Sequence, residues 1–189
     1  MQLLHKKLQV IFLVVFLASP FASFGQKETA NFAARNTVYA ELGGGSGRYA
    51  VNYSRIIYQK DKMKLNASAG FSMWKDLLFF SSRSSIWLPV IPLEISAFFG
   101  RSKHHLEIGS GFTSYLASRF QFSPDSYEVR EKVGFAAFVP FRIGYRYQKH
   151  EGGFFYRVGY TPFLILPLGG RENSVFEYRF GSISFGKSF

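Results

Sequence analysis

The chain has 189 residues, of which 47% are hydrophobic and 19% aromatic, and it carries a formal net charge of +11. This length and apolar content predict one sizeable domain and do not favour a second. Cysteine is absent, which excludes a disulfide framework, a lipoprotein anchor, zinc–thiolate sites and cysteine nucleophiles.

The first 25 residues have the pattern of a secretory signal peptide. Lys6 and Lys7 precede a short apolar core at 8–18, and small residues lie just before Gln26, where we expect cleavage. The apolar core is shorter than the about 20 residues that a transmembrane helix needs. Export removes two lysines and no acid, which lowers the formal charge from +11 to +9.

The net positive charge of the mature chain favours an anionic partner. Nucleic acid is one class of partner for a basic chain, but the sequence has no long basic helix and no clustered run of lysine and arginine. An exported protein also rarely meets nucleic acid. We therefore expect the charge to serve attraction to anionic lipid headgroups or polysaccharide.

After a polar segment at 26–36, which we expect to be a flexible lead-in, apolar residues recur at every second position. This is the period of a β-strand with one apolar face, and turn residues divide the pattern into strands. The predicted strands are 37–42, 48–59, 63–74, 87–99, 104–116, 133–148, 154–163 and 175–189.

Three places depart from simple alternation. The glycine-rich run at 43–47 follows a strand, but no helix pattern comes after it, so a hairpin turn is favoured over a phosphate-binding loop. The parity of apolar residues blurs at Ile56 and Ile57 and changes again near Gly181. A β-bulge is expected at the first of these sites, and a bulge or register shift at the second.

The connections between the predicted strands alternate in length. Short turns at 60–62, 100–103 and 149–153 alternate with longer connections at 75–86, 117–132 and 164–174. This asymmetry is typical of an up-and-down membrane barrel, in which the turns at one end are short and the loops at the other are long. The tight first connection is the exception.

The distribution of charge indicates which face of the strands is the interior. Glycine, serine and alanine lie largely on the charged face, as the crowded interior of an eight-stranded barrel requires. Lysine falls mainly in turns, whereas the charges within strands are mainly arginine and glutamate, which can pair across a closed lumen. The predicted lumen network consists of Glu41, Glu94, Glu107, Arg142, Arg146 and Arg157. The opposite arrangement, a soluble lipocalin-like barrel that binds a hydrophobic ligand, is the alternative.

The chain closes on an alternating apolar strand that includes Phe185 and Phe189. With the preceding strand pattern, this terminal aromatic resembles small eight-stranded outer-membrane barrels of the outer-membrane protein A and X kind, including uncharacterised outer-membrane β-barrel domains. The resemblance implies a cell outer-membrane location, insertion by the assembly machinery, contact with membrane lipid and lipopolysaccharide, and a filled, non-conducting lumen. The expected organisation is a signal peptide at 1–25, a periplasmic lead-in at 26–36 and an all-β, eight-stranded antiparallel transmembrane barrel at 37–189.

Some eight-stranded barrels modify lipid A, so a hydrolytic site is the second hypothesis. His105 and Glu107 share one strand face and have Ser96 or Thr113 as conceivable hydroxyl partners. However, His105 follows a short turn, which places it at the end of the barrel away from the outer leaflet. His104 and His105 point to opposite faces, which disfavours metal binding. We therefore expect no catalytic residue, cofactor or metal.

An apolar run in the connection after the third strand is the candidate contact of the external loops. Strand continuation or packing between loops is one interpretation of this run, and contact with lipopolysaccharide acyl chains or a partner protein is the other. The run consists of Leu77, Leu78, Phe79 and Phe80. The role of the protein, its loop partner and its oligomeric state stay open at this level.

Overall fold

The computed structural model describes residues 31–77, 85–100, 102–123, 128–168, 173–178 and 180–189. Eight long strands form one antiparallel sheet that closes on itself, because β5 pairs with β6. The closing strands are β1 (Asn36–Gly43), β2 (Tyr49–Lys60), β3 (Met63–Leu77), β4 (Ser85–Phe99), β5 (His104–Ser123), β6 (Glu128–Gln148), β7 (Gly153–Tyr160) and β10 (Gly181–Ser188). The predicted eight-stranded antiparallel up-and-down barrel is thus confirmed.

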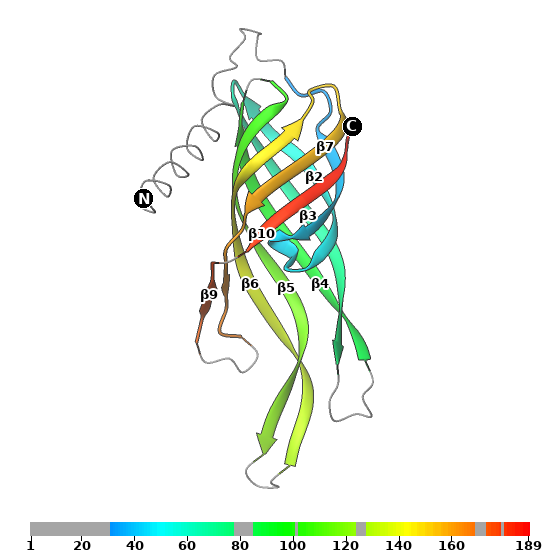
Figure 1. Ribbon diagram of the computed structural model, residues 1–189, viewed down its shortest axis with the longest axis vertical. Helices are drawn as coiled ribbons and strands as arrows, with labels where there is room; N and C mark the ends of the chain where they lie inside the picture. Colours follow the sequence, from blue (N-terminus) through cyan, green and yellow to red (C-terminus); the bar gives the residue numbers. More distant parts are fainter. Residues whose placement is uncertain (1–30, 78–84, 101, 124–127, 169–172, 179) are drawn as a thin grey trace, which may run out of the picture.

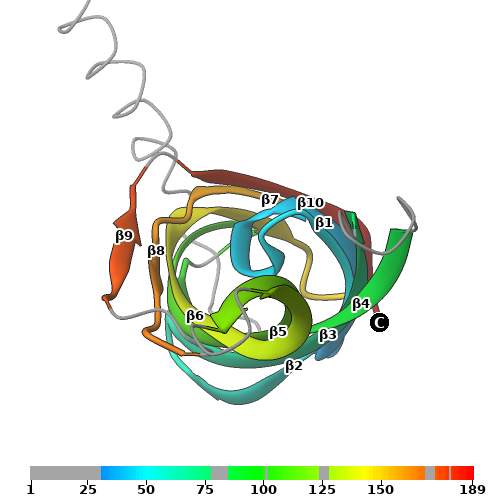
Figure 2. The same cartoon turned by 90° about the horizontal axis from the view of Figure 1, so that it is seen from below.

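Three small elements complete the described fold. A 3-10 turn, η2 (Gly44–Ser46), joins β1 to β2, and the short strands β8 (Phe163–Ile165) and β9 (Val175–Glu177) pair with each other. β8 also pairs with β6. Viewed along the barrel axis, β9 lies outside the ring of strands (Figure 2). Within the described residues, no helix has the length and apolar character needed to cross a membrane.

The two ends of the barrel differ in their connections. At one end, β2 and β3, β4 and β5, and β6 and β7 are joined by a few residues each; we call this the short-turn end. At the other, the long-hairpin end, β5 and β6 run together well beyond the rest of the wall (Figure 1). Both the start of β1 and the end of β10 lie at the short-turn end, where the backbones of Asn36 and Phe189 bond to each other.

The predicted loop at 117–132 is largely a hairpin, so its prediction as a loop was wrong. β5 and β6 stay paired from Ser118 opposite Val133 out to Ser123 opposite Glu128. The predicted connection at 75–86 is shortened in the same way, because Leu77 pairs with Ser85. The dense charge of the first stretch obscured the underlying strand alternation in the sequence.

Two predicted strands are each broken in two. The predicted strand at 154–163 is interrupted by Thr161 and Pro162, and it continues as β8. The predicted strand at 175–189 is interrupted between β9 and β10, at the place where the sequence parity changes. Proline has no N–H to donate to the ladder, although the Pro162 carbonyl still accepts from the Phe141 N–H at 2.8 Å. The predicted bulge in β2 is confirmed between Ile56 and Tyr58.

The described part of the expected lead-in is packed rather than free. The backbone N–H groups of Ala33 and Ala34 both donate to the His150 carbonyl at 3.1 Å, and Phe32 is 1% exposed. Residues 31–36, for which the sequence predicts a flexible segment, are thus packed in the structure, because the Phe32 side chain enters the barrel. Residues 26–30 lie outside the described residues.

Candidate functional site

The inner face of the barrel brings the six predicted network residues together. All six are buried, and they come from five strands: β1, β4, β5, β6 and β7. The formal charges balance, because three of the residues are carboxylates and three are guanidinium groups. The six residues are Glu41, Glu94, Glu107, Arg142, Arg146 and Arg157. Isolated buried charges are costly, and a fully hydrogen-bonded set of opposite charges offsets much of that cost.

Arg142 binds two of the carboxylates. Its Nε donates to Glu94 Oε2 at 3.0 Å, and its Nη2 donates to the same oxygen at 2.9 Å. Nη2 also donates to Glu41 Oε2 at 2.8 Å. The remaining nitrogen, Nη1, donates to Ser182 Oγ at 2.6 Å. Such fork-shaped pairing fixes the orientation of the guanidinium as well as its charge.

Arg157 joins the same carboxylates from the next strand. Its Nη2 donates to Glu41 Oε2 at 2.6 Å and to the Tyr39 hydroxyl at 3.0 Å, and its Nη1 donates to Glu94 Oε1 at 2.9 Å. The guanidinium also lies over the Tyr39 ring, 4.7 Å from its centroid. Tyr39 thus holds Arg157 both as a hydrogen-bond acceptor and as an aromatic surface.

Arg146 extends the network toward the short-turn end. Its Nη1 donates to Glu107 Oε1 at 3.0 Å, and its Nη2 donates to Gln148 Oε1 at 2.6 Å. Its guanidinium lies 4.3 Å from the centroid of the Phe98 ring and 5.0 Å from that of Phe155. The lumen at this level is therefore filled by packed side chains.

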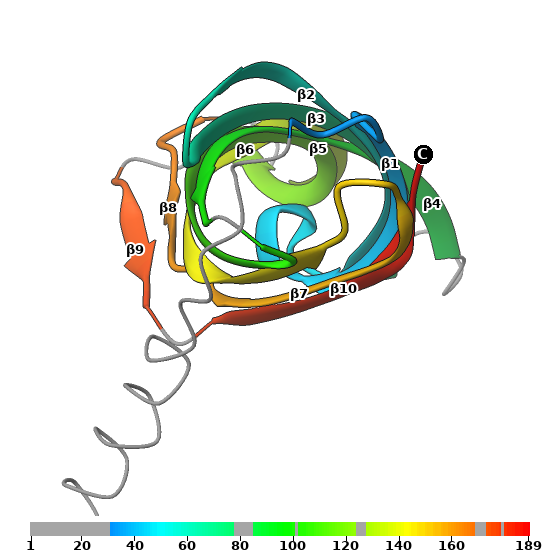
Figure 3. The ribbon, with the colours of Figure 1, turned by 90° about the horizontal axis from the view of Figure 1, so that it is seen from above.

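The glycine-rich turn folds into the barrel at the opposite end of the network. Gly44, Gly45 and Ser46 are all buried, and the turn lies inside the ring of strands (Figure 3). The Gly45 N–H donates to Glu41 Oε1 at 3.0 Å, and the Thr113 hydroxyl donates to the Gly45 carbonyl. A Cβ on Gly44 would lie 2.5 Å from Glu41 Oε1. The run of glycines, read from the sequence only as a hairpin turn, is thus also the signal of a plug.

The short-turn end is closed by the segment before β1. The Phe32 ring lies 4.3 Å from that of His150, 5.6 Å from that of His105 and 5.7 Å from that of Phe98. Lys64 Nζ donates to the Gly100 carbonyl at 2.9 Å beside this cluster. Burial, with the Lys64 charge, lowers the pKa of His150, which lies in the turn before β7.

The residues of the hydrolase hypothesis do not form a catalytic relay. Ser96 donates its hydroxyl hydrogen bond to Glu107 at 2.7 Å, and Glu107 is bound by arginines. His105 contacts the Gln148 carbonyl at 3.3 Å through Nε2, and its Nδ1 lacks a hydrogen-bond partner. In the part of the chain that the structure describes, no three potential metal ligands gather in one place.

The outer wall of the barrel has the opposite character. Large apolar side chains cover it on every strand, with exposed fractions such as 62% for Val51, 59% for Leu42 and 58% for Ile95. Among the charged residues with described side chains on the eight barrel strands, the exposed ones lie toward the ends of the wall: Arg55, Lys60, Lys75 and Lys187. Between these ends, the described wall is a continuous apolar band.

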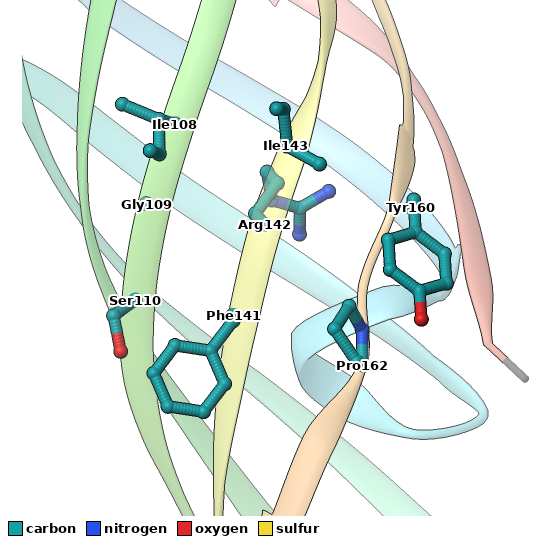
Figure 4. A pocket seen from close by; sticks show the side chains of 8 residues that line it. All are labelled: Ile108, Gly109, Ser110, Phe141, Arg142, Ile143, Tyr160 and Pro162. Atoms are coloured by element: carbon teal, nitrogen blue, oxygen red, sulfur yellow. The ribbon is translucent and has the colours of Figure 1, made fainter. Parts of the chain in front are cut away.

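A shallow groove of about 500 Å³ indents this band where β7 gives way to β8. Its walls are mainly apolar, and Arg142 contributes there although its guanidinium bonds to Glu94 in the lumen. The lining residues, drawn in Figure 4, are Ile108, Gly109, Ser110, Phe141, Arg142, Ile143, Tyr160 and Pro162. These residues provide no nucleophile beside a base.

The remaining predicted residues are placed as follows. Phe185 and Phe189 are 48% and 55% exposed, on the wall and at its short-turn edge. Leu77 ends β3 opposite Ser85. Leu78, Phe79 and Phe80 lie outside the described residues, as does the expected signal peptide at 1–25.

Comparison with known proteins gives one structural likeness. No protein-family model matches the chain, and no curated protein matches it. Among solved structures, it is similar to the N-terminal β-barrel domain of OprF from Pseudomonas aeruginosa, with 12% sequence identity and a TM-score of 0.47, over 82% of this chain and 96% of that one. A likeness of this degree carries no conclusion about function, which therefore has to come from the geometry described above.

Proposed function

We propose that this chain is an integral β-barrel of the cell outer membrane, with a sealed lumen and a non-enzymatic role in envelope structure or surface interaction. The observation that carries the proposal is the apolar outer wall. Side chains such as Val51, Ile95 and Val158 stand 62%, 58% and 48% exposed around it, while the arginines and glutamates lie inside.

This polarity is the reverse of that of a soluble barrel. A soluble monomer rarely exposes contiguous apolar patches beyond a few hundred Å², whereas an outer-membrane barrel needs an apolar band about 25 Å tall. A closed barrel is also one of the two backbone arrangements that satisfy all their hydrogen bonds within a bilayer. The wall therefore favours lipid as its surroundings over water, and it disfavours the lipocalin-like alternative.

The filled interior supports a structural rather than a transport role. The inward turn at Gly44–Ser46, the six-residue charge network and Phe32 occupy successive levels of the lumen. A barrel of eight strands has room inside for side chains or for one small ligand. With these side chains in place, specificity resides in the segments of the long-hairpin end.

The geometry gives no support to lipid A hydrolysis as a second function. His105 lies in the cluster at the short-turn end, and Glu107 is held by Arg146 and Arg157. A general base needs to reach both its nucleophile and an orienting acid, and Ser96 is instead bonded to Glu107.

The remaining parts of the proposal follow from the membrane location. They are export by the expected signal peptide, recognition of Phe185 and Phe189 by the assembly machinery, and contact with membrane lipid and lipopolysaccharide. The contact of Leu77, Leu78, Phe79 and Phe80 with acyl chains or a partner stays a prediction.

Fractionation of cells that produce the full chain tests the proposal. We expect the protein in the outer-membrane fraction and in two gel positions, a faster one when unheated and a slower one after boiling, because a folded barrel resists detergent. Recovery in the soluble periplasmic fraction would contradict the membrane location. Recovery in the membrane with one heat-independent position would contradict the closed barrel.

A further inference from the structure

We propose that the short-turn end carries a basic collar that binds the anionic headgroups of phospholipids in the leaflet around it. This inference rests on the proposed membrane location and names the lipid class at one end of the barrel. The collar consists of Arg35, Arg55, Lys60, Lys62, Lys103, Lys149 and Lys187, all of them exposed.

The collar has a large excess of positive charge. Its seven cations come from the segment before β1, from β2 and β10, and from all three short turns, so they are distributed around the rim. In the described part of this rim, the exposed acidic side chains are Asp61 and Glu151. Such a ring of one sign attracts anions from every side of the barrel.

The position of the cations decides that the anion belongs to a lipid. Lys187 lies on the outer wall with Val38 and Phe154 as its cross-strand neighbours, and these two are 43% and 56% exposed. A long cationic side chain beside apolar surface keeps its stem on that surface and extends its charge to the headgroups. Cations that border an apolar band lie at the height of lipid headgroups, so the anion that they meet is a headgroup and not a soluble ion.

Aromatic side chains mark the same level of the wall. The Tyr53 hydroxyl donates to Asn36 Oδ1 at 2.8 Å, and Lys103 Nζ lies 5.8 Å from the centroid of the Tyr147 ring. Tyrosine is enriched at the height of the headgroups because its ring is apolar and its hydroxyl is polar. Tyrosines and cations thus occupy one belt, as recognition of an interfacial phosphate requires.

The long-hairpin end supplies a control variant. There, Arg48 and Lys75 are exposed, and the Arg48 guanidinium lies over the Trp74 ring, 5.0 Å from its centroid. Exchanging this pair for glutamine removes two charges without touching the collar. Any preference that depends on total charge alone would respond to both sets of substitutions.

The test uses the full chain folded into mixed micelles that contain equal amounts of phosphatidylglycerol and phosphatidylcholine, with native mass spectrometry of the retained lipids. We expect a preference for phosphatidylglycerol of at least about fivefold, the effect of one engaged cation at an anionic surface, and its loss at high salt. The variant K60Q/K62Q/K103Q/K149Q should retain the two lipids within about twofold of each other, whereas R48Q/K75Q should keep the preference.

Several outcomes would overturn the inference. They are equal retention by the unmodified chain, an undiminished preference in the collar variant, or an equal loss in the R48Q/K75Q control. Competition by glycerol phosphate as effective as that by the lipid would indicate a site for a small phosphate, and heparin binding without a lipid preference would indicate a polyanion surface. Heat-dependent gel mobility verifies the fold of each variant, and Lys149→Gln alone replaces the collar variant if that variant does not fold.

Failure of this inference is distinguishable from failure of the proposed function. If the chain does not float with vesicles of phosphatidylcholine or with vesicles that contain phosphatidylglycerol, the membrane location is contradicted. If it floats with both and shows no lipid preference in micelles, the barrel stays in the membrane and the collar alone is contradicted.

Discussion

Arg157 Nη2 donates to Glu41 Oε2 over 2.6 Å, although the two residues are 116 positions apart in the sequence. The contact spans the inner face of β10, which pairs with both β7 and β1 in the closed sheet. Long-range pairing of this kind makes the lumen network depend on barrel closure, and it makes closure more favourable once the charges meet.

Removing one guanidinium from this network should be costly. Arg157→Met leaves Glu41 and Glu94 short of a positive partner inside the barrel, so we expect a loss of about 3–5 kcal/mol in the free energy of unfolding. Urea titration of the barrel in vesicles measures this loss. The exposed Arg55→Met is the control, with an expected change within about 0.5 kcal/mol; similar losses in both variants would contradict a special role for the network.

A glycine on β10 makes room for the tyrosine that holds Arg157. A Cβ on Gly186 would lie 2.5 Å from Tyr39 Cβ and 2.1 Å from the Val38 carbonyl oxygen, whereas a Cβ on Gly134 would meet nothing within 4 Å. Gly186→Ala should therefore destabilise the barrel by about 1–3 kcal/mol through overpacking, and Gly134→Ala should not. The same urea titration compares them, and equal midpoints would show that Tyr39 shifts without cost.

The aromatic cluster at the short-turn end should contribute as a core does. Phe32→Ala removes a ring that contacts those of His150, His105 and Phe98, and we expect a loss of about 3 kcal/mol. Phe154→Ala, on the outer wall, is the size-matched control and should cost less because removing a ring that is 56% exposed leaves no cavity between packed side chains. A loss within about 0.5 kcal/mol for Phe32→Ala would mean that the segment before β1 does not stay inserted.

The same cluster predicts a dependence of stability on pH. Burial lowers the pKa of His150 below its usual 6.5, and the Lys64 charge acts in the same direction, while Glu151 opposes it. The folded barrel then takes up a proton less readily than the unfolded chain, so stability is full above pH 6.5 and falls as the pH decreases through that value.

Urea midpoints between pH 7.5 and pH 5.5 measure this dependence. We expect the urea concentration at the midpoint to decrease as the pH is lowered. For His150→Gln this decrease should be smaller, because glutamine takes up no proton in either state. Identical slopes for the two proteins would show that His150 contributes nothing to the dependence.

The filled lumen predicts that the barrel conducts no ions. In a planar bilayer with the purified chain inserted, we expect no discrete conductance steps, since buried side chains occupy the interior at the level of Arg146 and Arg157. Protease protection in vesicles made with the same protein preparation verifies insertion. Stable steps of the size that water-filled barrels produce would contradict the sealed lumen.

Period-two alternation was sufficient to predict the eight barrel strands, their order and the face of Arg142 and Arg157, because an apolar outer wall around a charged lumen places one apolar residue in every two along a strand. It could not predict that the turn after β1 folds inward. Whether a glycine-rich turn leaves or enters the barrel depends on contacts such as that from the Thr113 hydroxyl to the Gly45 carbonyl, between residues 68 positions apart, which exist only after closure.

The burial of Phe32 could not be predicted from the sequence either, because its contacts are long-range. It is a single apolar residue within a polar stretch, and its partners His105 and His150 come from distant parts of the chain. The break before Gly181 was visible in the sequence as a parity change, whereas the prediction of one strand at 154–163 did not take Pro162 into account. The separate pairing of β8 with β9 could not be predicted, because three-residue strands leave no periodic signal.

The central claim is that the apolar outer wall faces lipid, and spin labels test it most directly in this cysteine-free chain. Cysteines introduced one at a time at Ile95, Val158 and the turn residue Lys149 are labelled after insertion into vesicles. We expect the labels at 95 and 158 to respond to dissolved oxygen far more than to a water-soluble nickel complex, and the label at 149 to show the reverse. A response to nickel at 95 and 158 as strong as that at 149 would contradict the account.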